Sequence, residues 1–109
     1  MDSYTRLIAQ AKPSGNQTAA IIIAAGANSN LKKQRVVIDK IIVSMSATGT
    51  FTLTSAITTG VIVPVLNILA NTTIEISGFT QLKSAPGEGV DLTTVGGNTT
   101  YLIEYHYAP

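Results

Sequence analysis

His106 is the single histidine of this sequence and its strongest candidate for acid–base chemistry. Glu104 lies two residues earlier, so in an extended strand the two side chains project from one face and can touch. A catalytic base also needs a nucleophile within reach and a third group that orients it, and the residues around His106 identify neither. We therefore interpret Glu104 and His106 as a solvated or interface pair and predict that the protein is not an enzyme.

The acidic residues do not follow the pattern of a metal-binding or glycosidase site. They are scattered along the chain as Asp2, Asp39, Glu75, Glu88, Asp91 and Glu104, without the spacing of a calcium loop. Nothing places two of them in one cleft, as glycoside hydrolysis requires. The chain has no cysteine, which excludes disulfides and thiolate ligands, and one imidazole cannot build a histidine-rich zinc site. We expect no metal, no cofactor and no small-molecule substrate.

The glycine-rich segment Gly87-Glu88-Gly89 looks like a fragment of a phosphate-binding loop. No Lys-Ser or Lys-Thr pair follows it and no helix is predicted to begin there, so the pattern says little about nucleotides. Because Pro86 precedes it, the segment is instead typical of a turn between strands.

The basic residues gather at one place, Lys32, Lys33 and Arg35. Such a cluster is either a solvated loop or a local contact to an acidic protein surface or, weakly, to phosphate. Nucleic-acid binding needs many more cations than a chain with 12% charged residues and a net charge of +1 supplies, so we expect no nucleic-acid partner. Four tyrosines without a tryptophan are also a poor signature of a sugar-binding platform.

The elements that must position these groups are predicted to be β-strands throughout. Ile, Val and Thr, which are β-branched and fit a pleated sheet, make up about a third of the 109 residues. The expected strands are residues 18–24, 35–46, 50–55, 61–66, 70–77, 79–83, 90–94 and 99–107. Their regular spacing predicts an all-β fold, an antiparallel β-sandwich that is jelly-roll-like and has seven or eight short strands. Pro64 predicts an edge strand or a bulge, because proline cannot donate to a ladder.

The first 17 residues differ from the rest of the chain. Tyr4, Leu7 and Ile8 have a helix-like spacing sufficient for one turn at most, and residues 12–17 form a loop with Pro and Gly. We predict an N-terminal arm over residues 1–17, extended or flexible, and a single β-sandwich domain over residues 18–109. The arm is either a frayed terminus or a segment that docks its apolar residues on a neighbouring subunit.

Hydropathy predicts neither a signal peptide nor a membrane partner. The longest apolar runs, residues 19–25 and 61–66, are far shorter than the ~20 residues that a membrane helix needs. With 45% hydrophobic and 12% charged residues, part of the surface is expected to be covered by partner chains.

The order of several segments resembles a known family. An Ile-rich strand ends in Ala24-Ala25-Gly26, residues 84–92 read Ser-Ala-Pro-Gly-Glu-Gly-Val-Asp-Leu, and a Tyr-Leu-Ile-Glu-Tyr strand follows at residues 101–105. Over residues 18–107 this order resembles the small β-sandwich head decoration (cement) proteins of tailed bacteriophages. The resemblance implies a jelly-roll-like protein, usually trimeric, that binds outside the capsid and clamps adjoining capsomers. No individual site residue carries over from it.

The resulting hypothesis is a virion structural protein, a bacteriophage capsid decoration protein. Its expected partners are further copies of the chain, in a homotrimer, and the major capsid protein. Its expected location is the capsid surface, after synthesis in the host cytoplasm. The alternatives are a phage neck, tail or fibre component and, with less support, a carbohydrate-binding β-sandwich. The candidate subunit or capsid contacts are Tyr4, Leu7, Ile8, Lys32, Lys33 and Arg35.

Overall fold

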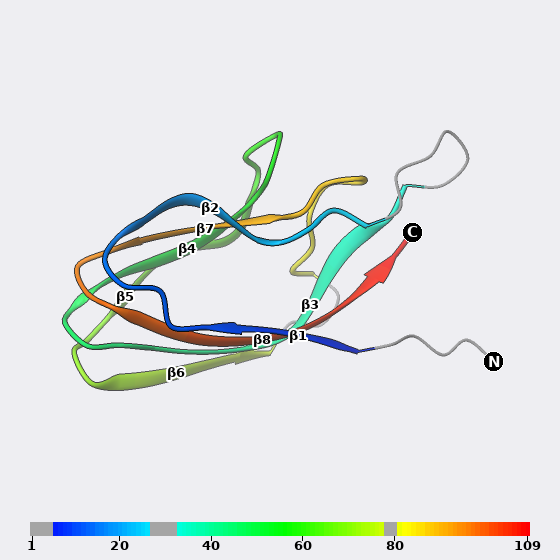
Figure 1. Cartoon of the computed structure of the whole chain (residues 1–109). Coiled ribbons are helices and arrows are strands. Elements are labelled where there is room, and N and C mark those ends of the chain that lie inside the picture. The colour runs from blue at the N-terminus through cyan, green and yellow to red at the C-terminus, as the bar shows by residue number, and fades with distance from the viewer. Residues whose placement is uncertain (1–5, 27–32, 78–80) are drawn as a thin grey trace.

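The computed structural model describes residues 6–26, 33–77 and 81–109, which form eight strands and, within these ranges, no helix (Figure 1). The strands are β1 (Leu7–Ala11), β2 (Gln17–Ile23), β3 (Arg35–Met45), β4 (Gly49–Ser55), β5 (Val61–Ile68), β6 (Thr72–Ser77), β7 (Val90–Val95) and β8 (Thr99–Ala108). They build two antiparallel four-stranded sheets that pack face to face: a first sheet, β1-β8-β3-β6, and a second sheet, β2-β7-β4-β5. The predicted all-β antiparallel sandwich is confirmed. None of the described segments is a helix that could span a membrane.

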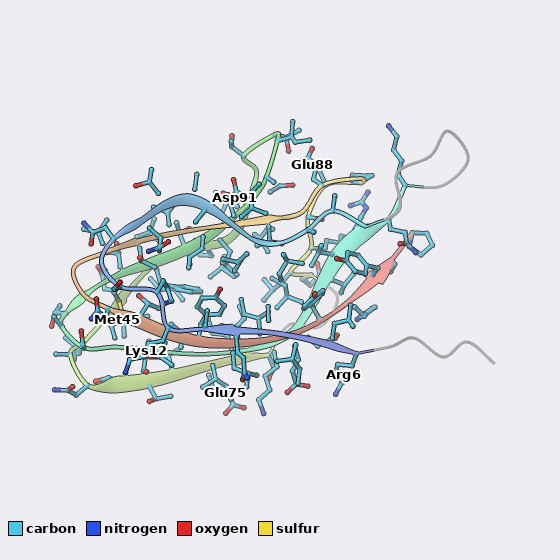
Figure 2. All side chains as sticks on the ribbon, viewed as in Figure 1. Arg6, Lys12, Met45, Glu75, Glu88 and Asp91 are labelled. Carbon is cyan, nitrogen blue, oxygen red and sulfur yellow. The ribbon has the colours of Figure 1, made fainter. Side chains whose placement is uncertain are left out.

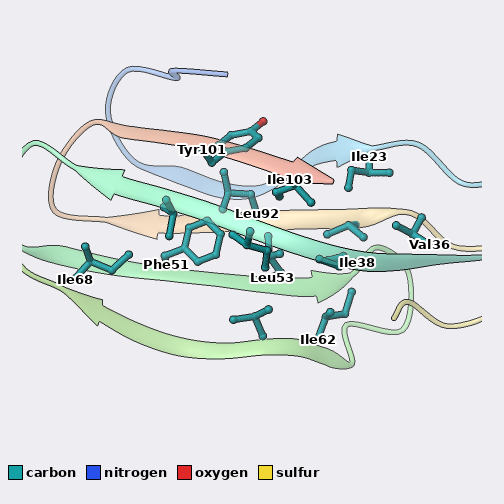
Figure 3. Close-up of a cluster of buried hydrophobic side chains, with 14 of the residues drawn as sticks. Ile23, Val36, Ile38, Phe51, Leu53, Ile62, Ile68, Leu92, Tyr101 and Ile103 are labelled. Atoms are coloured by element: carbon teal, nitrogen blue, oxygen red, sulfur yellow. The ribbon is translucent and has the colours of Figure 1, made fainter. Parts of the chain in front are cut away.

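Alternating side chains from both sheets fill the space between them (Figure 3). In β4, Phe51 and Leu53 are fully buried, whereas Thr50, Thr52 and Thr54 are half-buried on the outer face, as the alternation in the sequence predicts. The other buried apolar residues of the core are Ile23, Val36, Ile38, Ile41, Val43, Met45, Ile62, Val63, Ile68, Val90, Leu92, Tyr101 and Ile103. The core therefore draws on both sheets, and every strand leaves its opposite face for other contacts.

A bulge in β3 changes which residues of this strand face the core. In the pairing of β3 with β8, Ile38 lies opposite Tyr105, and the next paired residue, Lys40, lies opposite Glu104. Asp39 therefore has no partner in β8 and is the extra residue of the bulge. Before the bulge, even-numbered residues such as Ile38 are buried, and after it odd-numbered residues such as Ile41 are buried. The bulge thereby lets one long strand bury both of its apolar halves and places Asp39 on the outer face.

The edges of the second sheet are irregular. Pro64 lies in β5, an edge strand whose register with β4 shifts at two places, so the predicted edge strand and bulge are both confirmed. On the opposite edge, the register of β2 with β7 also shifts twice, and Ala19 has a φ of 46°. At both edges the backbone N–H and C=O groups are therefore not regularly spaced for pairing with a further strand.

Two local predictions were wrong. Leu7 and Ile8 lie in β1, not in a helical turn, because pairing with β8 outweighs the weak tendency of one isolated turn to form. The strand predicted over residues 79–83 is reduced, in its described part, to a bridge between Lys83 and Val37. There the chain follows β3 irregularly, with the Ile38 amide donating to the Leu82 carbonyl at 2.8 Å.

Three short connections gather at one end of the sandwich and bond to one another. The Gly15 amide donates to Asn98 Oδ1 at 2.8 Å, the Gly96 amide donates to Asn16 Oδ1 at 3.0 Å, and the Ser46 amide donates to the Asn98 carbonyl at 2.9 Å. These bonds join the β1–β2, β3–β4 and β7–β8 turns. The C-terminal end of β8 lies at the opposite end of the sandwich (Figure 1).

Candidate functional site

The single histidine pairs with a carboxylate that the local sequence did not identify. His106 Nδ1 lies 2.9 Å from Oδ2 of Asp39, the residue at the β3 bulge. Arg6 donates to Glu104 Oε1 at 3.3 Å, and its Nε lies 3.9 Å from Asp39 Oδ2. Sequence spacing suggested a Glu104–His106 pair, but Asp39 lies 67 residues before His106 in the chain and reaches it only through the β3–β8 pairing.

This cluster joins three neighbouring strands of the first sheet. Arg6 precedes β1, Asp39 lies in β3, and Glu104 and His106 lie in β8. The arrangement provides ion pairs across the outer face of the sheet, where each exposed pair contributes about 0.2–1 kcal/mol. Arg6 thus forms ion pairs with Glu104 and Asp39, and His106 adds a hydrogen bond to Asp39, so that the polar side chains link three strands.

Two adjoining recesses of about 520 and 390 Å³ open on the outer face of the first sheet, and His106 and Glu104 line neither of them. The larger has Ile42 and Leu102 among its lining residues, and both recesses are bordered by Lys12, Ser44, Thr73 and Thr100. The lining is mostly hydroxyl-bearing and aliphatic, and it brings no carboxylate near the lysine.

The most densely bonded polar group is Glu88, which lies in the glycine-rich segment. Its Oε1 accepts bonds from the Ser55 hydroxyl at 2.6 Å, the Ile57 and Thr58 amides at 3.0 Å each, and the Thr58 hydroxyl at 3.1 Å. These bonds, with Ser55 as the largest cause, lower the pKa of Glu88 from 4.5 to about 2. We call Glu88 with Ser55, Ile57 and Thr58 the Glu88 clamp.

The segment around the clamp also ties the two sheets together. The Ser84 hydroxyl accepts a bond from the Val36 amide of β3 at 2.9 Å, and the Ala85 amide donates to the Ser55 hydroxyl of β4 at 3.0 Å. The Glu88 amide donates to the Ala85 carbonyl at 3.1 Å, which closes the turn that the sequence predicts. Residues 84–92, one of the segments that carry the family resemblance, therefore stabilise the fold through these hydrogen bonds.

The outer face of the second sheet carries almost no charge. Asp91 is the single ionisable residue in its four strands, and Asp91 is only 7% exposed. Its Oδ1 is buried without a hydrogen-bond partner among the described residues, and burial raises the pKa of this carboxyl. In Figure 2, Asp91 lies on the second sheet, whereas Arg6 and Glu75 extend from the opposite side of the sandwich.

Exposed apolar side chains concentrate on the same face. Ile21 is 71% exposed, Val61 67%, Val65 63% and Val95 52%, and all four lie in strands of the second sheet. In the first sheet, the corresponding large apolar residue is Ile8 at 59%. We call the outward side of the second sheet the neutral face. Its side chains include Ile21, Thr50, Thr52, Thr54, Val61, Val65, Asp91, Thr93 and Val95, of which Asp91 is buried by its neighbours.

The predicted contact residues do not form one patch. Leu7 is half-buried and Ile8 exposed on β1, an edge strand, whereas Lys33 and Arg35 lie at the start of β3, on the other side of β8. Tyr4 and Lys32 lie outside the described residues. Lys83 bridges to Val37 and so places a cation beside β3, which sequence spacing did not associate with Lys33 and Arg35.

The sequence interpretation missed the neutral face and the clamp. The sequence shows that each strand of the second sheet contains few charged residues. It does not show that these four strands lie in the same sheet, because strand order depends on residues far apart in the chain. Comparison with known proteins found no matching protein family, no matching curated protein and no matching solved structure. The arguments for function therefore come from the geometry of this chain.

Proposed function

We propose that this protein is a structural component of a bacteriophage virion, a decoration protein that binds the outer capsid surface as a homotrimer and strengthens contacts between capsomers. The observation that carries the proposal is the strand order, β1-β8-β3-β6 packed on β2-β7-β4-β5. Every connection except β4–β5 passes from one sheet to the other. This order supports a jelly roll, a double-sheet fold common in viral capsid domains and also found in lectins.

The use of polar groups favours a structural role. The Glu88 clamp and Ser84 fasten the two sheets at one end, and the turns around Asn98 fasten each other at the opposite end. A protein that stiffens a shell must itself resist deformation, and hydrogen bonds at both ends of a sandwich provide that resistance. In the described residues these polar side chains bond to the fold. Ser46 and Asn98 also line the smaller recess, whose lining includes no carboxylate.

The capsid-facing surface that we propose is the end with the basic residues. Among the described residues, Lys33, Arg35 and Lys83 form no ion pair and neither does Lys12 at the other end, whereas Arg6 and Lys40 are paired with carboxylates. Unpaired cations at one end suit docking to an acidic protein surface. Many identical copies on one particle would make the attachment stable even if each contact is weak.

The carbohydrate-binding alternative has less support from the aromatic residues. Tyr101 is 6% exposed, and Tyr105 and Tyr107 are half-buried and pack edge to face with ring centroids 5.7 Å apart. The Tyr107 hydroxyl donates to the Ala24 carbonyl at 2.7 Å. These rings hold the fold, so the described tyrosines do not make an exposed stacking strip.

The test is the location of the protein on a particle, together with its mass in solution. We expect sedimentation equilibrium to give three times the chain mass, and immunogold electron microscopy to label the head surface of the virion. Label confined to the neck, tail or fibres would establish the alternative virion role. A protein that is monomeric at all concentrations and absent from virions would overturn the proposal.

A further inference from the structure

The outer face of the first sheet is hollowed near the turns that gather around Asn98. Two adjoining recesses of about 520 and 390 Å³ lie there, volumes within the range of sites that hold a ligand. In the strand pairing, Ser44 of β3 lies between Thr100 of β8 and Thr73 of β6. The hollow therefore follows from three short hydroxyl side chains placed side by side on three strands.

The two recesses differ in chemistry and share a border. The larger has an aliphatic floor, where Leu102 of β8 lies opposite Ile42 of β3, and both side chains are half-buried. The smaller is lined mainly by hydroxyl and amide groups, Asn98 among them. An apolar subsite and a polar subsite therefore lie directly beside each other. The residues that line both are Lys12, Ser44, Thr73 and Thr100.

The polar subsite offers a positive charge and a hydrogen-bond donor. Lys12, directly after β1, is exposed and forms no ion pair with the described residues (Figure 2). Asn98 Oδ1 accepts the Gly15 amide at 2.8 Å, which leaves the side-chain nitrogen of Asn98 as a donor. In the described part of the chain no carboxylate lines either recess, and Glu75, farther along β6, pairs with Lys40 at 3.4 Å. The subsite is therefore complementary to an anion.

We propose that these recesses bind the C-terminal residue of a partner polypeptide, with its carboxylate at Lys12 and its aliphatic side chain on Leu102 and Ile42. Capture of a C-terminal carboxylate is a recurring mode of peptide recognition. The contact lies away from the basic end of the sandwich, so it goes beyond the proposed capsid docking.

The adjacency of the two subsites favours a C-terminal residue over other anionic segments. In a C-terminal residue the carboxylate and the side chain are attached to the same Cα. An internal Asp or Glu carries its carboxylate on a different Cα from an aliphatic neighbour, and adjacent side chains of an extended chain point to opposite sides. A neutral segment would remove water from Lys12 without supplying a counter-charge.

Short peptides test the assignment on the isotope-labelled full chain by nuclear magnetic resonance titration. The test ligand is N-acetyl-Gly-Leu with a free carboxylate. Its amide, N-acetyl-Gly-Leu-NH₂, removes the charge, N-acetyl-Gly-Gly removes the aliphatic side chain, and N-acetyl-Asp-Leu-NH₂ moves the carboxylate to an internal residue. We expect saturable shifts of the Ser44, Thr73 and Thr100 amides with a dissociation constant of about 1 mM for the test ligand, ordinary for its size. The other three peptides should each bind about tenfold more weakly.

Two matched variants test the role of the lysine. Lys12→Gln removes the charge at the recess, and Lys83→Gln removes a charge at the opposite end of the sandwich. Both lysines are exposed and have no ion pair within the described ranges, so each variant should keep the fold, which its amide spectrum verifies. Lys12→Gln should weaken binding of the test ligand about tenfold, and Lys83→Gln should leave it unchanged.

Four outcomes would overturn the assignment. They are wild-type protein without saturable shifts up to about 20 mM test ligand, equal binding of N-acetyl-Gly-Leu-NH₂ or N-acetyl-Asp-Leu-NH₂, unchanged binding by Lys12→Gln, and an equal loss in Lys83→Gln. None of these results depends on the oligomeric state or on a location in the virion, so the proposed function stands or falls separately.

Discussion

Replacing Glu88 with glutamine removes the charge from the carboxylate that closes the β4–β5 turn. In the folded protein the pKa of Glu88 is lowered from 4.5 to about 2, and at about 1.4 kcal/mol per unit this corresponds to about 3 kcal/mol of stability at neutral pH. The side chain is 6% exposed, so solvent screens these bonds little. Glutamine retains an oxygen that accepts hydrogen bonds but loses the charge, so we expect E88Q to lose about 3 kcal/mol at pH 7, and E88A, which loses the oxygen as well, to lose more.

The pH dependence distinguishes the charge from simple packing. Because the folded pKa lies below the unfolded one, the contribution of Glu88 is fully present above pH 4.5 and is lost as the pH falls towards 2. Urea unfolding of wild type and E88Q should therefore show a gap in unfolding free energy at pH 7 that shrinks nearly to zero at pH 2.

A matched control is Glu75→Gln, which removes a carboxylate from an exposed pair with Lys40 at 3.4 Å. That substitution should cost less than about 1 kcal/mol. A gap between wild type and E88Q that stays constant from pH 7 to pH 2, or one no larger than that of Glu75→Gln, would refute the account of the Glu88 clamp.

Two further substitutions test the packing around the second sheet. Asp91→Asn should stabilise the protein at pH 7. Burial raises the folded pKa of Asp91, so its ionisation opposes folding increasingly as the pH rises above 3.8. Thermal melts at pH 3 and pH 7 should show that the melting temperature gained by Asp91→Asn grows with pH. Gly89→Ala should cost about 2 kcal/mol, since a Cβ there would collide with the Ile23 carbonyl, whereas Gly60→Ala has open space and should melt within about 0.5 kcal/mol of wild type.

Local sequence patterns predicted those structural features that are determined by residues close together in the chain. The alternation around Phe51 and Leu53, the edge strand marked by Pro64, and the turn before Glu88 each follow from residues within one short segment. Strand β1 was missed because its pairing partner, β8, lies about 90 residues away, and the one-turn helical spacing at Leu7 and Ile8 was the sole local signal.

The candidate sites depended on longer-range information. His106 meets Asp39 because a bulge in β3 changes the side to which that carboxylate points, and bulges of this kind leave no clear mark in a single sequence. The neutral face arises because four strands without exposed charge assemble in one sheet. The charge content of each strand was readable, but the strand order that brings them together was not. The predicted capsid and subunit contacts stay predictions.

The position of β8 has a consequence for how the protein is made. This strand is the last of the eight to leave the ribosome, yet it lies between β1 and β3 and completes the first sheet. Until residues 99–108 emerge, a nascent chain holds two strands whose main partner does not yet exist. The sandwich therefore completes its folding only after β8 has emerged, and a chain that terminates prematurely before Thr99 is left with unpaired strands as a substrate for chaperones and proteases.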